Sequence, residues 1–254
     1  MIKSMDINCD MGESFGNWNM GNDYAMMGQI TTANVACGFH AGDPLTMLDT
    51  IAKAKTDNVL VGSHPGLPDL MGFGRRAMNI SAEDAYAYTI YQTGALQAAL
   101  KVNGMTLHHV KPHGAFYSVL KTDETLAAAV ADAISQLSDK PMLYWPAPTD
   151  AAMPSAARKK GIRVVGEIYP DLHYAPDGAL IIQREKHETD ISFATAQVTR
   201  YIETGQVQAV DGSLITLDAE SLCIHGDGPN AVEVSVAIHK AMKKVGCNAS
   251  AITH

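Results

Sequence analysis

The sequence predicts an α/β protein whose parallel strands close into a (β/α) barrel of seven or eight strands. Strand-like and helix-like segments alternate along the chain, which implies parallel pairing and right-handed crossovers. The chain has 254 residues, close to the roughly 250 that such a barrel needs. Residues 59–64 form a compact apolar run, as buried parallel strands do. We expect one domain, residues 1–254, with an open doubly wound sheet as the second choice.

The elements follow from local signals in chain order. Strands are expected at residues 5–10, 31–36, 59–64, 105–111, 142–145, 162–167, 179–183 and 222–225. Helices are expected at residues 44–56, 81–102, about 123–137, 151–160, 191–204 and from after Pro229 to about 245, with a short helix within 14–29. Asp43 is a plausible N-cap before Pro44, and Ser81 with Asp84 marks another helix start.

Composition excludes several classes of function. The formal charge of −8 argues against general affinity for nucleic acid or anionic membranes, which need a basic surface. No run approaches the length of a membrane span, and the N-terminus has no apolar signal segment. Four cysteines without a CxxC pair suit a reducing compartment, so we expect a cytoplasmic protein.

Polar residues gather at the predicted carboxyl ends of the strands. In a barrel these ends share one face, where active sites of this fold lie. They are Asp10, Glu13, His40, Asp43, His64, Lys111, His113, Glu167, Asp171, Arg184, His225 and Asp227. The sequence therefore predicts an active site on this face.

Individual residues have ordinary alternatives. Lys111 ends an apolar strand, where an unpaired charge is costly, so it requires an anionic ligand or a salt bridge with Asp10 or Asp227. Arg75 lies in a long Gly- and Pro-rich loop, residues 65–76, and with Arg76 forms either a solvated pair or a lid over a carboxylate.

Several familiar motifs are absent. The sequence has no P-loop, no GxGxxG after the first strand, no HExxH and no GxSxG. Asp and His at strand ends can bind a divalent metal, but no diagnostic ligand spacing is present, so no tightly bound metal is expected.

Five blocks of the sequence resemble the LamB/YcsF family. They are residues 8–13 (NCDMGE), 33–44 (ANVACGFHAGDP), 62–76 (GSHPGLPDLMGFGRR), 110–117 (VKPHGAFY) and 224–230 (IHGDGPN). The resemblance implies a barrel similar to glycoside hydrolases and polysaccharide deacetylases. It also implies ATP-dependent opening of 5-oxo-L-proline to L-glutamate as the A component of a 5-oxoprolinase, with subunits B and C as partners and Mg²⁺ only as the counter-ion of ATP. Leu172 departs from the family, which usually has arginine there.

This chemistry assigns expected roles to the strand-end residues. Water attack on a phosphorylated lactam needs a general base, an acid for the ring nitrogen and cations for the anionic groups. Asp10 or His64 is the expected base, and His113 or His225 the expected acid. The remaining expected site residues are His40, the anion-binding Lys111 and Arg75, and Glu13, Asp43 and Asp227, which orient the histidines. A metal-dependent sugar deacetylase or amidohydrolase and a non-catalytic scaffold protein stay open as alternatives.

Overall fold

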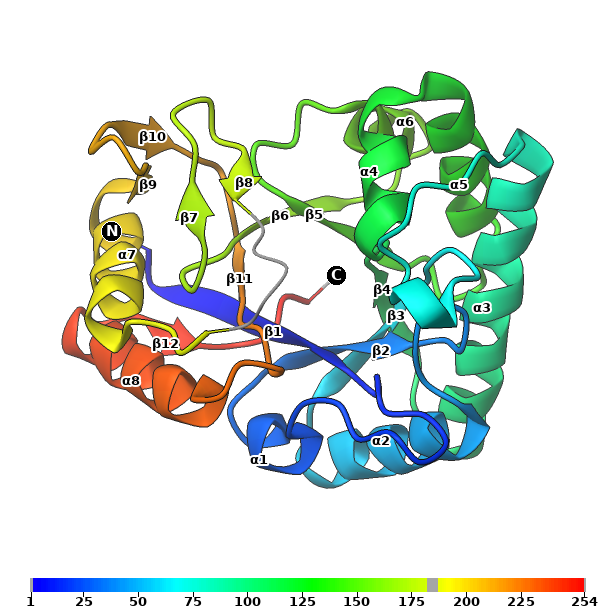
Figure 1. Cartoon of the computed structure of the whole chain (residues 1–254), viewed down its shortest axis with the longest axis horizontal. Helices are drawn as coiled ribbons and strands as arrows, with labels where there is room; N and C mark the ends of the chain where they lie inside the picture. The colour runs from blue at the N-terminus through cyan, green and yellow to red at the C-terminus, as the bar shows by residue number, and fades with distance from the viewer. Residues whose placement is uncertain (1, 182–186, 254) are drawn as a thin grey trace.

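The computed structural model describes residues 2–181 and 187–253, whose strands form a ring with helices around it (Figure 1). The barrel strands are β1 (Ser4–Met11), β2 (Thr32–Ala36), β3 (Leu60–His64), β4 (Leu107–Val110), β5 (Met142–Pro146), β6 (Val164–Ile168) and β11 (Ser221–Cys223). The helices are α1 (Asp23–Met27), α2 (Pro44–Thr56), α3 (Ala82–Val102), α4 (Gly114–Thr122), α5 (Glu124–Ser135), α6 (Ala152–Lys159), α7 (Ile191–Thr204) and α8 (Ala231–Lys244), with the 3-10 turn η1 (Leu70–Gly72).

The sheet closes through β1, which pairs in parallel with both β2 and β11. In the closing pair Asp6 lies opposite Ser221 and Asn8 opposite Cys223. The order β11-β6-β5-β4-β3-β2-β1, with β11 returning to β1, is a closed barrel of seven parallel strands among the described residues. The prediction of a closed barrel is therefore confirmed, and the open sheet is excluded.

The predicted helix starts are present. The Asp43 side chain accepts the backbone N–H of Thr46 at the start of α2, and Pro44 occupies the first helical turn. Ser81 and Asp84 form a reciprocal capping box at α3. Each cap satisfies backbone donors that a helix start leaves without an internal partner.

One predicted barrel strand is wrong. The sequence predicts residues 179–183 in the barrel, but β8 (Leu180–Ile181) pairs antiparallel with β7 (His173–Tyr174) in a small separate hairpin. A second hairpin, β9 (Gln206–Gln208) with β10 (Leu214–Thr216), precedes β11. Both lie in the stretch that connects β6 to β11. The seventh barrel strand is therefore β11, which the sequence places eighth.

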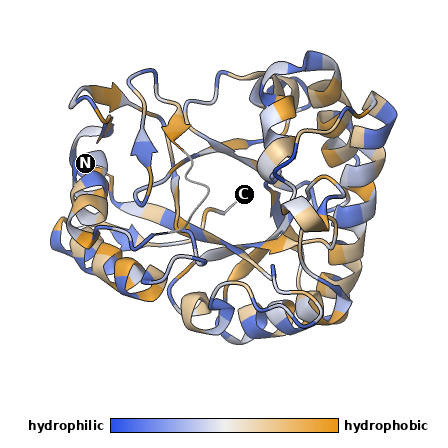
Figure 2. Ribbon diagram, in the orientation of Figure 1, coloured by the Kyte–Doolittle hydropathy of each residue, from blue (hydrophilic) through white to orange (hydrophobic). Residues whose placement is uncertain are grey.

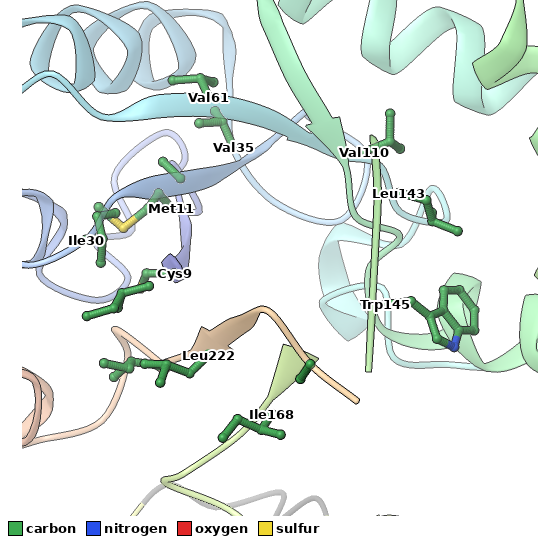
Figure 3. Packing of buried hydrophobic residues seen from close by; sticks show 14 of the residues in the cluster. Cys9, Met11, Ile30, Val35, Val61, Val110, Leu143, Trp145, Ile168 and Leu222 are labelled. Carbon is green, nitrogen blue, oxygen red and sulfur yellow. The ribbon is translucent and has the colours of Figure 1, made fainter. Parts of the chain in front are cut away.

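The apolar core lies between the barrel and its helices. Along β1, Cys9 and Met11 face this layer, and Val35 and Val61 from the next two strands join them (Figure 3). The helices mix hydrophobic and hydrophilic residues along their length, as Figure 2 shows. Because side chains alternate along a strand, the intervening Asp6, Asn8 and Asp10 point into the barrel. The inside of this barrel is thus unusually polar.

The C-terminal segment covers the amino ends of the strands. After α8, β12 (Asn248–Ala249) pairs with β1 at Ser4 and Met5. The carbonyl oxygen of Ile252 then lies 2.7 Å from Nε2 of His108 in β4, and Ile252 packs against the cluster of Met142, Tyr144 and Val165. The carboxyl ends of the strands lie at the opposite end of the barrel. In the part of the chain that the structure describes, we find no helix with the length and apolarity of a membrane span.

Candidate active site

The carboxyl ends of the strands bring most of the predicted residues together. Asp10 lies near the end of β1, His64 ends β3, and Lys111 directly follows β4. Glu13, His40, His113 and His225 lie in the loops just beyond four of the strands. The predicted polar face therefore exists, and its members touch one another.

Lys111 is the central cation of the site and is buried. Its Nζ lies 3.1 Å from Asp10 Oδ1, 3.4 Å from Glu167 Oε2 and 3.2 Å from Asn8 Oδ1. Burial alone lowers a lysine pKa, but the charges of Asp10, the Cys223 sulfur and Glu167 raise the pKa of Lys111 well above its ordinary value. The predicted alternative of a Lys111–Asp10 salt bridge is confirmed.

The side-chain amides of Asn8 and Asn34 extend this hydrogen-bond network across the inside of the barrel. The Asn8 amide donates to Glu167 Oε2 at 2.9 Å and to Ser221 Oγ at 2.8 Å. The Asn34 amide donates to Asn8 Oδ1 and Asp10 Oδ1, both at 2.8 Å. These asparagines, fully buried, fix the direction of both carboxylates.

Backbone carbonyls determine the tautomers of His64 and His113. His64 Nδ1 lies 2.6 Å from the carbonyl oxygen of Lys111, and His113 Nε2 lies 2.8 Å from that of Phe73. A carbonyl only accepts, so these two ring nitrogens carry the hydrogens. The remaining nitrogens, His64 Nε2 and His113 Nδ1, face each other at 3.0 Å.

His40 is fully buried behind this pair. Its ring stacks on His113 with centroids 3.7 Å apart and planes 7° from parallel. Its Nε2 lies 3.4 Å from Glu13 Oε1, and Nδ1 has no hydrogen-bond partner in the described structure. The Nε2–H tautomer is therefore consistent with donation to Glu13.

Burial and crowding shift the pKa values of this group in opposite directions. Burial, reinforced by Asp10 and Asp227, raises the pKa of Glu13 well above its usual range. Burial also raises the pKa of Asp10, but His64 and Lys111 outweigh it and hold that pKa well below the ordinary value. Burial, together with His64, lowers the pKa of His113 to about 3. Asp10 is thus an ionised carboxylate of the site.

His225 forms a separate carboxylate–imidazole pair. Asp171 Oδ2 accepts the His225 backbone N–H at 3.0 Å and lies 2.8 Å from its Nδ1. The His225 side chain is 20% exposed, whereas that of Asp171 is 6% exposed. Because the buried Asp171 carboxylate accepts the Nδ1–H of His225, Nε2 of the accessible His225 ring is available for proton transfer.

A pocket opens between these groups. It is lined by Asp10, Glu13, Phe73, Arg75, His113, His225, Gly226 and Asp227, and its empty space is about 260 Å³ including the open mouth. The enclosed cavity itself is about 20 Å³, room for about one water molecule, so an organic ligand enters only when the lining side chains move. Arg75, stacked over Phe73 at 4.9 Å, supplies a cation to the wall.

Two predicted or considered residues lie elsewhere. Asp43 caps α2 and accepts the Gly16 backbone N–H at 2.8 Å, so its carboxylate supports the loop after β1. Arg76 pairs with Asp69. Arg184 lies outside the described residues.

The sequence analysis overlooks the asparagines and the backbone carbonyls. Asn8 and Asn34 carry a detectable signal, because polar residues at alternate positions in a buried strand must face a polar interior. The carbonyls of Phe73 and Lys111 have no signal in residue type. Their positions depend on the folded path of the 65–76 loop and of β4.

Comparison with known sequences gives a match over nearly the whole chain. The sequence model of the LamB/YcsF family matches residues 5–254. A protein of Bordetella pertussis (strain Tohama I), named as the A component of 5-oxoprolinase, is 44% identical over 97% of this chain and 98% of its own. One of the same name from Bacillus cereus (strain B4264) is 43% identical over 96% of this chain and 97% of its own.

Comparison with solved structures agrees. The lactam utilization protein of Thermus thermophilus superposes with a TM-score of 0.89 at 40% identity, covering 98% of this chain and 100% of its own. A putative cellobiose-phosphate cleavage protein of Enterococcus faecalis V583 has a TM-score of 0.58 at 13% identity, covering 98% of this chain and 97% of its own. The second likeness shows a shared barrel fold only.

Proposed function

The chain belongs to the LamB/YcsF family, and from this premise we propose that it is the A component of a 5-oxoprolinase that opens 5-oxo-L-proline to L-glutamate. Relatives that carry this name are 41–44% identical over 96–99% of this chain. Their lettered names imply a multi-subunit enzyme. We propose subunits B and C as its partners and ATP as the co-substrate; a cytoplasmic location stays a prediction.

The observation that carries this proposal is the pocket at the carboxyl end of the barrel. 5-Oxoproline is small and has a carboxylate and a cyclic amide. Arg75 in the pocket wall suits the carboxylate, and Asp10 and His225 line the same pocket. Charge-assisted contacts of arginine with carboxylates are strong and directional. The pocket thus offers an anion-binding group beside two groups that can manage protons.

The geometry favours one of the two residues expected as the base and one of the two expected as the acid. Both nitrogens of His113 are occupied, Nδ1 by His64 and Nε2 by the Phe73 carbonyl, so His113 is poorly placed to protonate a substrate. His225 keeps Nε2 for this purpose and is therefore the proposed acid for the leaving ring nitrogen. His64 is similarly engaged, which leaves Asp10 Oδ2 as the acceptor that positions and deprotonates water.

In the proposed reaction, the lactam oxygen is phosphorylated by ATP before water attacks the ring carbon. The water gives its proton to Asp10 as a C–O bond forms, and the C–N bond breaks as His225 protonates nitrogen, which leaves an acyl phosphate. A second water then displaces phosphate from the acyl carbon and releases L-glutamate and inorganic phosphate. The sequence contains no P-loop. We therefore propose that subunits B and C share the nucleotide contacts, and that Lys111 stabilises charge near Asp10.

The test is ATP- and 5-oxoproline-dependent glutamate release by this chain assembled with subunits B and C. Wild type should turn over, and His225→Gln should lower kcat about 10²–10⁴-fold, the usual contribution of a general acid. His173→Gln, an exposed histidine on β7, is the matched control and should keep wild-type kcat.

The possible outcomes test the oxoprolinase proposal and the role of His225 separately. Absence of turnover by the properly assembled wild type would overturn the oxoprolinase proposal. Wild-type turnover with an equally active His225→Gln variant would keep the function and remove His225 from proton transfer.

A further inference from the structure

Two imidazole nitrogens, His64 Nε2 and His113 Nδ1, face each other in the buried site. His64 and His113 each commit their only N–H to a backbone carbonyl, at 2.6 and 2.8 Å. In the neutral rings, His64 Nε2 and His113 Nδ1 then present lone pairs to each other at 3.0 Å. Two acceptors at hydrogen-bond distance repel, and Asp10 Oδ2 lies 3.4 Å from His64 Nε2 and adds negative charge there, so the neutral pair favours an electrophile that both nitrogens share.

The surroundings favour a metal cation over a proton. Glu13, His40, His64 and His113 are all buried, and one potential ligand atom from each lies within 4.8 Å of the others. Glu13 is 8% exposed, and it contacts His40 at 3.4 Å. Asp10 and Asp227 add negative charge beside it. A buried carboxylate among acids gains more from a divalent ion than from one shared proton.

The carbonyl contacts are those of metal-ligating histidines. A ligating imidazole usually donates its other N–H to a carboxylate or carbonyl, which fixes the tautomer and ring direction. His64 and His113 both do so. Zinc–nitrogen bonds of about 2.0–2.1 Å place two ligand nitrogens roughly 2.9–3.4 Å apart for angles between about 90° and 109°. The observed 3.0 Å falls in this range.

We propose that the site holds one divalent transition-metal ion, Zn²⁺ by preference, ligated by His64 Nε2, His113 Nδ1 and the Glu13 carboxylate. Two imidazoles and one carboxylate suit Zn²⁺ and do not suit Mg²⁺, which prefers oxygen ligands. With three protein ligands, a fourth position is left for water or substrate at the pocket. The sequence-based expectation of no tightly bound metal is thereby revised.

Ring geometry excludes His40 as a fourth ligand. A histidine nitrogen donates its lone pair in the plane of its ring. His40 and His113 are stacked nearly parallel, so an ion in the plane of His113 lies outside the plane of His40. His40 is instead a positioning residue, which holds the Glu13 carboxylate through Nε2 and supports the His113 ring from behind.

The first experiment measures metal on the wild-type full chain. After removal of metals with a chelator, the protein is dialysed against Zn²⁺ alone, and bound metal is counted by mass spectrometry. X-ray absorption at the zinc edge then counts imidazole ligands. We expect about one Zn²⁺ per chain with two imidazoles. A lack of saturable Zn²⁺ binding, or a first shell with three imidazoles, overturns the proposal.

Polar substitutions of the proposed ligands test which residues bind the metal. His64→Gln, His113→Gln and Glu13→Gln should each lose stoichiometric Zn²⁺, whereas His173→Asn, on the exposed hairpin, should bind like wild type. His40→Asn should weaken binding about 10- to 100-fold, as removal of a supporting partner does, while the number of imidazole ligands stays two. Equal binding by the ligand variants and the control would refute the assignment.

A shared proton is the competing electrophile and has its own signature. It predicts a strongly downfield imidazole proton in the nuclear magnetic resonance spectrum of wild type, unchanged on addition of Zn²⁺; this result overturns the metal proposal. Loss of any such signal as Zn²⁺ binds supports it. Because no readout requires turnover, the metal proposal and the oxoprolinase proposal can fail independently.

Discussion

Replacement of Lys111 by methionine tests the charge arrangement inside the barrel. Methionine keeps the apolar stem and removes the ammonium, which contacts Asp10 at 3.1 Å and Glu167 at 3.4 Å. The Lys111 backbone carbonyl that fixes His64 is unaffected. The variant therefore leaves two carboxylates, 20% and 0% exposed, without their shared cation.

The expected loss of stability follows from these distances. At an effective dielectric constant near 20, a charge pair about 3 Å apart interacts by about 5 kcal/mol. Removal of one partner from a buried pair usually destabilises by about 3–5 kcal/mol, because the remaining charge stays desolvated. For a chain of this size, roughly 2–4 °C of melting temperature accompany each kcal/mol. We therefore expect Lys111→Met to melt about 6–20 °C below wild type.

Calorimetry and urea unfolding of wild type, Lys111→Met and Lys101→Met measure the effect. Lys101 is exposed on α3, and its replacement should change the free energy of unfolding by no more than about 0.5 kcal/mol. Addition of Glu167→Gln to Lys111→Met should restore part of the loss, since it removes one of the two unpaired charges. A Lys111→Met variant within about 1 kcal/mol of wild type, close to the spread of surface substitutions, would refute this account.

Two further predictions concern local structure. Hydrogen bonds from the Thr46 and Gly16 backbones hold the pKa of Asp43 below its usual value, so its contribution is present at neutral pH and lost as pH falls through that lowered pKa. Asp43→Ala should therefore be about 0.5–2 kcal/mol less stable than wild type at pH 7, and the gap should narrow below about pH 4 in acid unfolding experiments; a gap independent of pH contradicts the cap. In Gly62→Ala the new Cβ collides with the His109 ring, which should reduce stability by about 1–3 kcal/mol. Gly94→Ala, in an open position of α3, should instead gain about 0.5–1 kcal/mol, and equal effects of the two in thermal unfolding would refute the packing argument.

The sequence predicts most elements because their signals are local. Helix α2 begins at Pro44 behind an Asp43 cap, and α7 spans the expected 191–204, since both combine a cap with an amphipathic run. Helix α4 escapes prediction, because Pro112-His113-Gly114 resembles a loop although Gly114 begins the helix. The prediction for 179–183 is wrong, because a short apolar segment has the same pattern in a barrel and in a hairpin.

The site is predictable in position and less so in detail. Residues such as Asp10 and His64 follow from the rule that parallel strands share a carboxyl end. The same rule does not predict which atoms contact one another, because these contacts depend on how the barrel closes and on the path of the loops. The contact of His113 with the Phe73 carbonyl, for example, joins the end of β4 to the middle of a loop 40 residues earlier.

The position of β1 between β2 and β11 has a consequence for biosynthesis. β11 leaves the ribosome roughly 210 residues after β1, which at about 5–20 residues per second takes about 10–40 s. During that interval one edge of β1 has no partner strand and can pair with other nascent chains. The strand that carries Asp10 therefore keeps one unpaired edge until the last barrel strand has been made.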